Sequence, residues 1–134
     1  MTKNLLQSVG VLYRTYLSYA NEFLMDTDVS FSESVVISNI GLAEGISQEE
    51  ISLSLYIDRA AIARNVKSLE KKGYVKTMRA SSDKRTKELY LTDKGHKMYD
   101  FIEEKNKERI DHLFKDITND ELEAFKTILN KIKL

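Results

Sequence analysis

The first stretch of the chain has apolar residues at alternating spacings of four and three, which is the pattern of one helical face. A helix is therefore predicted over residues 4–25, with an apolar stripe wider than one neighbouring helix needs. A second helix is predicted from residue 31 to about residue 43, with Gly41 and Gly45 breaking it. The chain thus begins with two predicted helices, and the apolar stripe of the first is wide enough to contact more than one other helix.

Two shorter helices with a tight connection are predicted next. Residues 47–50 read Ser-Gln-Glu-Glu, a capping box in which the Ser and Glu side chains satisfy each other's backbone donors, so a helix should start there and run to about Leu55. Asp58 is a suitable N-cap for another helix that ends at Lys72, and Gly73 stands where a left-handed residue ends a helix. Two helices joined by such a short turn indicate a helix-turn-helix.

The hydrophobic pattern then changes from a helical to an alternating one. Residues 75–79 have β character, residues 80–85 form a polar turn, and residues 86–91 alternate with Leu89 and Leu91 on one side. This pattern predicts a β-hairpin directly after the second short helix. Together they indicate a winged helix-turn-helix.

Two more amphipathic helices are predicted after the hairpin, over residues 93–115 and 118–132. The predicted fold class is therefore all-α with a small β wing, in which a winged helix-turn-helix is flanked by N- and C-terminal helices.

We expect one domain over residues 1–134. Its DNA-binding lobe should span about residues 31–92, and its dimerisation helices should lie within residues 4–25 and 94–134. The wide stripe of the first helix and the apolar face of the last predict a homodimer, because those surfaces would otherwise remain in water.

Total charge gives no sign of a nucleic-acid partner, but the distribution of charge does. The chain of 134 residues has 21 Lys+Arg and 21 Asp+Glu, so its formal net charge is zero. Counted along the chain, residues 1–55 carry a net charge of −5, residues 56–100 of +6, and residues 101–134 of −1. The basic segment contains the second short helix and the hairpin, which are the elements predicted to bind DNA.

The absence of certain residue types and motifs argues against several other classes of protein and kinds of site. Zero Cys excludes disulfides, thiolate metal sites and Cys nucleophiles. No glycine-rich phosphate loop, nucleophile elbow or paired metal motif occurs, so we predict neither an enzyme nor a cofactor or metal site. His96 and His112 would lie about 24 Å apart along one helix, too far to share an ion within a subunit. No apolar run could span a membrane and no signal peptide is visible, so the expected address is the cytoplasm.

The predicted helix that ends at Lys72 has one apolar face and an opposite basic face. An advance of 100° per residue brings Val66 and Leu69 close to Ile62, so these three should be buried. The opposite face carries Ala60, Arg64, Lys67 and Lys71, with Ala61, Ser68 and Lys72 on a flank. Small side chains allow close approach to base edges, Arg64 can reach a guanine, and the lysines suit phosphates. An ordinary solvated basic face is the alternative.

The tip of the predicted hairpin is also charged, with Asp83, Lys84 and Arg85 in succession. A cation on an extended loop can enter the minor groove, where the negative potential is enhanced. A tip kept charged to discourage edge pairing is the alternative.

Taken in order, these segments resemble one known family. The motifs are SQEEI at 47–51, IDR at 57–59, LEKKGYV at 69–75, DKR at 83–85 and LTDKG at 91–95. They are similar to those of the MarR family of bacterial transcriptional regulators, and the helix order fits over the whole chain. The resemblance implies a homodimeric repressor or activator with two recognition helices in successive major grooves of double-stranded DNA.

The resemblance also assigns residues. The family's acidic-x-Arg wing motif maps onto Asp83 and Arg85, where the Arg enters the minor groove and the Asp supports it. Many members have Arg where this chain has Thr77, so that contact is not expected here. The expected DNA-binding residues are Arg59, Ala60, Ala61, Arg64, Asn65, Lys67, Ser68, Lys71, Lys84 and Arg85.

Members of the family have an effector pocket between the dimer helices and the DNA-binding lobe. The resemblance therefore implies a small aromatic or phenolic effector, with Tyr13, Tyr16 and Phe31 as candidate pocket residues. We predict a sequence-specific regulator, a repressor, that binds a pseudo-palindromic operator as a homodimer and is released by a small ligand. The alternative is a winged helix that docks proteins without reading DNA, but such a face would more often expose aromatics than cations.

Overall fold

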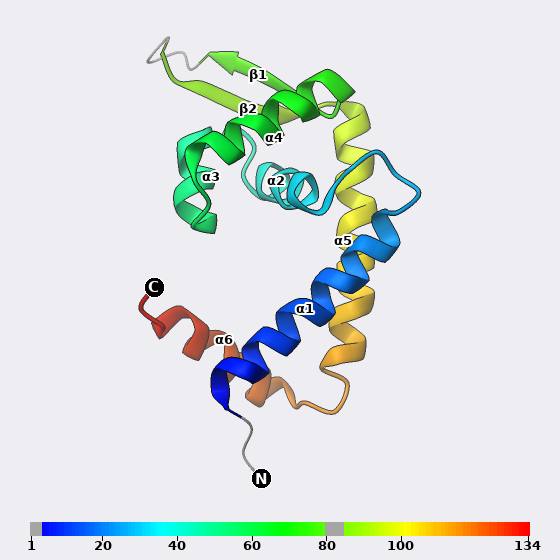
Figure 1. Cartoon of the computed structure of the whole chain (residues 1–134), viewed down its shortest axis with the longest axis vertical. Coiled ribbons are helices and arrows are strands. Elements are labelled where there is room, and N and C mark those ends of the chain that lie inside the picture. The colour runs from blue at the N-terminus through cyan, green and yellow to red at the C-terminus, as the bar shows by residue number, and fades with distance from the viewer. Residues whose placement is uncertain (1–3, 80–84) are drawn as a thin grey trace. The chain divides into compact units, whose positions relative to one another are not determined.

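The computed structural model describes residues 4–79 and 85–134 and has the predicted order of elements (Figure 1). The elements are α1 (Leu5–Leu24), α2 (Phe31–Leu42), α3 (Gln48–Leu55), α4 (Arg59–Lys72), β1 (Val75–Arg79), β2 (Lys87–Leu91), α5 (Asp93–Leu113) and α6 (Asn119–Lys131). The predicted fold class, mostly helical with a small antiparallel sheet, is confirmed. The predicted boundaries agree with the observed ones to within two residues.

The described chain divides into two compact units. One comprises the described residues up to Ile102, and the other comprises Glu103–Leu134. The first unit contains α1 to β2 and the first half of α5, and the second contains the rest of α5 and α6.

Helices α2, α3 and α6 each begin at a capping box, which satisfies backbone donors that a helix start leaves free. In each box the N-cap hydroxyl accepts from the third helical residue, and that residue's carboxylate accepts from the N-cap amide. The pairs are Ser30 with Glu33, Ser47 with Glu50, and Thr118 with Glu121. The box predicted at residues 47–50 is confirmed.

The turn between α3 and α4 is short and tightly bonded. Tyr56 has φ 55°, a left-handed conformation that is uncommon for a residue with a side chain. The Ser52 hydroxyl donates to the Ile57 carbonyl over 2.5 Å. Asp58 then caps α4 by accepting from the Ala61 amide over 3.0 Å, as predicted. These bonds set the direction in which α4 leaves the turn.

The core of the first unit lies where α2, α3, α4 and the two strands meet. The first half of α5 adds Ile102. The largest fully buried side chains are Val36, Ile37, Ile40, Ile51, Ile62, Val66, Leu69, Leu89, Leu91 and Ile102. Complete burial of one such side chain contributes about 1.5–3 kcal/mol to folding. The stripe predicted for α4, which is Ile62, Val66 and Leu69, is confirmed as its buried face.

Strands β1 and β2 pair antiparallel, with Val75 opposite Leu91 and Arg79 opposite Lys87. Leu89 and Leu91 face the core, as the alternating pattern predicted. The other edge of β2 bonds to the segment before α3, because the Gly45 amide donates to the Leu89 carbonyl over 2.8 Å. The small sheet is thereby attached to the start of the helix-turn-helix.

The prediction that Gly41 helps to break α2 is wrong, because Gly41 is helical and α2 ends after it, at Leu42. Gly41 instead allows a close contact: a Cβ there would lie 2.2 Å from ring atoms of Tyr99 in α5. Gly45 does lie beyond the helix end, with φ 95°.

Candidate nucleic-acid interface

Helix α4 presents a basic face opposite its buried stripe. Ala60, Arg64, Lys67 and Lys71 are exposed, as is Arg59 at the start of the helix, whereas Ala61 is only partly exposed. Gly73, with φ 86°, ends the helix as predicted, and its amide donates to the Leu69 and Glu70 carbonyls. The structure therefore brings these expected DNA-binding residues together on one surface.

Two other expected residues of α4, Asn65 and Ser68, are partly buried against α2. Ser32 Oγ donates to Asn65 Oδ1 over 3.4 Å, and Ser68 Oγ donates to Glu33 Oε2 over 2.7 Å. Both side chains therefore have partners within the protein. A DNA contact by either stays a prediction.

Arg59 has a carboxylate partner on the neighbouring helix. Its Nη2 lies 2.5 Å from Glu49 Oε1 in the first turn of α3, and both side chains are exposed. Exposed ion pairs of this kind contribute little to stability. The pair joins the start of α4 to the first turn of α3.

The base of the wing lies beside the start of α3. An open groove of about 300 Å³ is lined by Ser47, Gln48, Glu49, Arg85, Thr86 and Lys87. Arg85 is exposed at this groove, as a wing contact requires. The predicted wing residues Asp83 and Lys84 lie outside the described residues, so their roles stay predictions.

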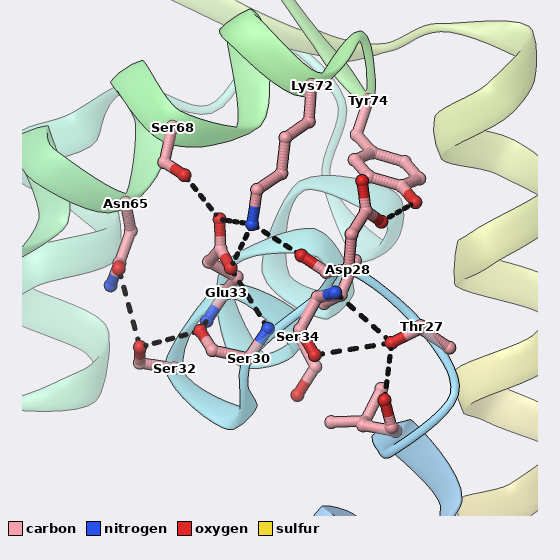
Figure 2. A network of polar contacts seen from close by, with 12 residues as sticks. Thr27, Asp28, Ser30, Ser32, Glu33, Ser34, Asn65, Ser68, Lys72 and Tyr74 are labelled. Carbon is pink, nitrogen blue, oxygen red and sulfur yellow. Dashed lines mark hydrogen bonds and ion pairs between the residues drawn. The ribbon is translucent and has the colours of Figure 1, made fainter.

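A buried polar network joins α2 to the end of α4, and sequence reasoning missed it (Figure 2). Glu33 has only 4% of its surface exposed, and its carboxylate accepts from Ser68 and Lys72 of α4. Burial raises the pKa of Glu33, but hydrogen bonds from Ser30, Lys72 and Ser68 outweigh burial and lower that pKa below its ordinary value. The Ser-x-x-Glu motif at residues 30–33 was the signal that could have drawn attention to Glu33.

The same network continues to the residue that follows Gly73. The Tyr74 hydroxyl donates to the Asp28 carboxylate, and Lys72 Nζ donates to the Asp28 carbonyl (Figure 2). Burial, followed by the hydrogen bond to Asp28, raises the pKa of Tyr74 to about 12. The loop before α2 and the corner after α4 are thus bonded to each other.

The aromatic residues predicted for an effector pocket are not all in one environment. The rings of Tyr16 and Phe31 pack edge to face, with centroids 5.9 Å apart, whereas Tyr13 is exposed on α1. Their part in ligand binding stays a prediction.

Over residues 4–79 and 85–134, no three His, Asp or Glu side chains lie close enough together to hold a metal ion. No helix in that part of the chain has the length and apolarity to cross a bilayer.

The fold and this surface define a winged helix-turn-helix DNA-binding protein: a short capped helix, a tight turn, a basic second helix and a two-stranded wing. Residues 27–86 match the model of the MarR family. The HTH-type transcriptional regulator PapX of Escherichia coli is 30% identical over 114 residues, which cover 84% of this chain and 70% of PapX. The chain belongs to the MarR family.

Other relatives extend the match over nearly the whole chain. The HTH-type transcriptional regulator YybA of Bacillus subtilis is 25% identical over 130 residues, which cover 97% of this chain and 87% of YybA. A MarR family regulator of Listeria monocytogenes, solved with a 26mer DNA, superposes with a TM-score of 0.90 at 28% identity over 97% of this chain and 87% of that chain. The protein is therefore a DNA-binding transcriptional regulator, and these findings do not favour the protein-docking alternative.

Proposed function

We propose that this regulator acts as a homodimer that binds a pseudo-palindromic operator in the bacterial cytoplasm and represses transcription there, by binding alone and without a catalytic step. The observation that carries this proposal is the pairing of a basic exposed face on α4 with exposed apolar faces on two other helices in the described part of the chain. The basic face supplies the DNA contacts, and the apolar faces supply the subunit contact.

The uncovered apolar faces belong to α1 and α6. On α1 the exposed residues are Leu5, Leu6, Val9, Val11, Leu12 and Tyr13, and on α6 they are Phe125, Ile128 and Leu129, followed by Ile132 and Leu134. No residue of α6 is buried, although its apolar side chains recur at helical spacing and form one face. Apolar patches of this kind on a soluble protein mark interaction sites, and a second copy of the same helices supplies a matching surface.

A two-fold axis between the subunits would present two copies of α4 to the DNA. Their half-sites would then lie about one helical turn apart, with centres separated by about 34–36 Å. Within each half-site we assign base reading to Arg64 and phosphate contacts to Lys67 and Lys71, since Arg is suited to guanine and Lys to phosphate. Arg85, with Lys84 and Asp83, would serve the minor groove.

The charge distribution supports this assignment. The segment 56–100 carries a net charge of +6, so a dimer would present two such segments to one duplex. If each subunit neutralises about four phosphates, log K should fall with log[salt] with a slope near −7.

We also propose release by a small aromatic or phenolic ligand, with Tyr16 and Phe31 at its site and Tyr13 nearby. Such a ligand would act by binding better to a dimer whose lobes are wrongly spaced for the operator. The edge-to-face packing of Tyr16 on Phe31 supports this site, because it joins the first helix to the DNA-binding lobe.

The direct test combines footprinting with light scattering. We expect the protein to protect two half-sites, one helical turn apart, in DNA that flanks its own coding region, and to elute as a dimer at micromolar concentration. A repetition with salicylate present tests ligand release, for which protection should be lost. A monomer, or protection of a single half-site, would overturn the dimer proposal.

A further inference from the structure

The buried carboxylate of Glu33 accepts hydrogen bonds from two side chains of α4. Its Oε1 accepts from the Ser30 amide over 3.0 Å and from Lys72 Nζ over 2.9 Å. Its Oε2 accepts from Ser68 Oγ over 2.7 Å and from Lys72 Nζ over 3.1 Å. Figure 2 shows the carboxylate of Glu33 between the Ser68 and Lys72 side chains, with α2 below and α4 above. A buried carboxylate that accepts four hydrogen bonds from three residues holds those residues at defined positions.

The two partners on α4 are four residues apart, so they lie on the same side of the helix, one turn apart. That side is a flank between the buried stripe of α4 and its basic face. Packing of the apolar stripe against the core determines which face of α4 is buried. Hydrogen bonds are directional, so the bonds of Glu33 add a further constraint on the rotation of α4 about its axis, and with it on the direction of Arg64.

Lys72 is withdrawn from the basic face by the same contacts. Its ammonium donates to both oxygens of Glu33 and to the Asp28 carbonyl, and its side chain is 30% exposed. A cation paired in this way adds little to the attraction of phosphates, which is the part of binding that does not depend on sequence.

We propose that Glu33 is a positioning residue for DNA recognition, which sets the rotation of α4 through Ser68 and keeps Lys72 paired inside the protein. It thereby favours sequence-specific over non-specific binding. This proposal rests on DNA binding through α4, but not on a particular operator, effector or sign of regulation.

The test compares two duplexes with four variants of the full chain. A 26-base-pair duplex is selected from a randomised pool with the wild-type protein, and a scrambled duplex of the same composition serves as the non-specific probe. Affinities for both are measured by fluorescence anisotropy at several salt concentrations. The variants are Glu33→Gln, Ser68→Ala, the double variant Glu33→Gln/Lys72→Met, and Glu70→Gln as a control that changes the same charge on an exposed residue of the same lobe.

For Glu33→Gln we expect the ratio of specific to non-specific affinity to fall about tenfold, because a displaced base-reading side chain loses discrimination. We expect its salt slope on the scrambled duplex to steepen by about one unit per subunit as Lys72 is released. In the double variant the salt slope should return to the wild-type value, because the Lys72 cation is gone. The ratio of specific to non-specific affinity should stay low, because α4 still lacks its bonds to the Glu33 carboxylate. A double variant of this kind can remain folded because both charges are removed together.

Ser68→Ala should lower the ratio without changing the slope, because it removes one bond and leaves the ion pair. Should Glu33→Gln not fold, the double variant tests the positioning role, because it also lacks the Glu33 carboxylate, whereas Ser68 is itself an expected DNA contact. Equal ratios for Glu33→Gln and Glu70→Gln would overturn the proposal, and so would recovery of the wild-type ratio in the double variant. If the wild-type protein enriches no sequence at all, the operator itself is refuted, and this separates failure of the proposed function from failure of the positioning role.

Discussion

A Cβ added at Gly95 would lie 2.0 Å from the carbonyl oxygen of Tyr74. The start of α5 therefore packs against the backbone of the corner between α4 and β1. Two hydrogen bonds of Thr92 strengthen the contact: its amide donates to the Tyr74 carbonyl over 3.0 Å, and its hydroxyl donates to the Gly73 carbonyl over 2.6 Å. Only glycine fits at position 95 without a shift of one backbone against the other.

Gly95→Ala should therefore lower the free energy of unfolding by about 3 kcal/mol, because the added methyl meets backbone that cannot yield. Gly73→Ala is the matched comparison. Among the described residues other than its chain neighbours, the nearest atom to its Cβ would be Lys94 Cδ at 4.0 Å, so the strain of its positive φ is the main cost, about 1 kcal/mol. Urea denaturation followed by circular dichroism measures both. Equal losses in the two variants would contradict the packing account.

The second prediction concerns pH and Glu33. Its carboxylate has a pKa below the ordinary value of 4.5, because hydrogen bonds from Ser30, Lys72 and Ser68 outweigh the opposing effect of burial. The ionised group therefore stabilises the fold fully above about pH 4.5, and this contribution is lost as the pH falls through the lower pKa of the folded state.

We expect the unfolding free energy of the wild-type protein to fall more steeply below pH 4.5 than that of Glu33→Gln, which has no proton to gain there. Glu70→Gln, a change at an exposed carboxylate, should keep the wild-type slope. Denaturant titrations at intervals of half a pH unit would measure this. Parallel curves for the wild type and Glu33→Gln would count against the network as a source of acid sensitivity.

The third prediction separates base reading from phosphate binding on α4. Arg64→Ala should weaken operator binding by about 1–3 kcal/mol and relax the base preference at one position of each half-site. Lys67→Ala should weaken binding to all sequences alike and lower the salt slope by about one unit per subunit. Anisotropy titrations with single-base operator variants distinguish the two effects, and Lys115→Ala, outside the DNA-binding lobe, is the control. Loss of affinity without altered base preference in Arg64→Ala would assign Arg64 to the phosphates.

The parts of the fold that were predictable from sequence have local causes. Ser47 with Glu50, Asp58 before α4 and Gly73 after it act on backbone groups within a few residues, so their patterns are visible in a short stretch of chain. The buried stripe of α4 was predictable for the same reason, since helical period alone determines which residues share a face.

The Glu33 network was not predictable, because Ser68 and Lys72 are 35 and 39 residues away from Glu33 along the chain. Periodicity placed Ser68 on a flank of α4 but could not say that α2 lies against that flank. The prediction that Gly41 ends α2 is wrong for a related reason. Its partner, Tyr99, lies on another helix, and a glycine that permits close packing has the same local signal as one that ends a helix.

The last prediction tests whether the exposed apolar face of α6 joins two subunits. Ile128 is 57% exposed on that face, and Leu53 is 67% exposed on α3, outside the helices assigned to the dimer. Ile128→Asp should place a charge in the proposed subunit contact, where an unpaired carboxylate is costly to bury, and so produce monomers in light scattering at micromolar concentration. Leu53→Asp makes the same chemical change on a surface that stays in water, so it should remain dimeric. Because one subunit reads one half-site, the Ile128→Asp monomer should also lose most of its affinity for the full operator while its α4 stays folded. A dimeric Ile128→Asp variant with normal operator binding would exclude this face of α6 from the interface.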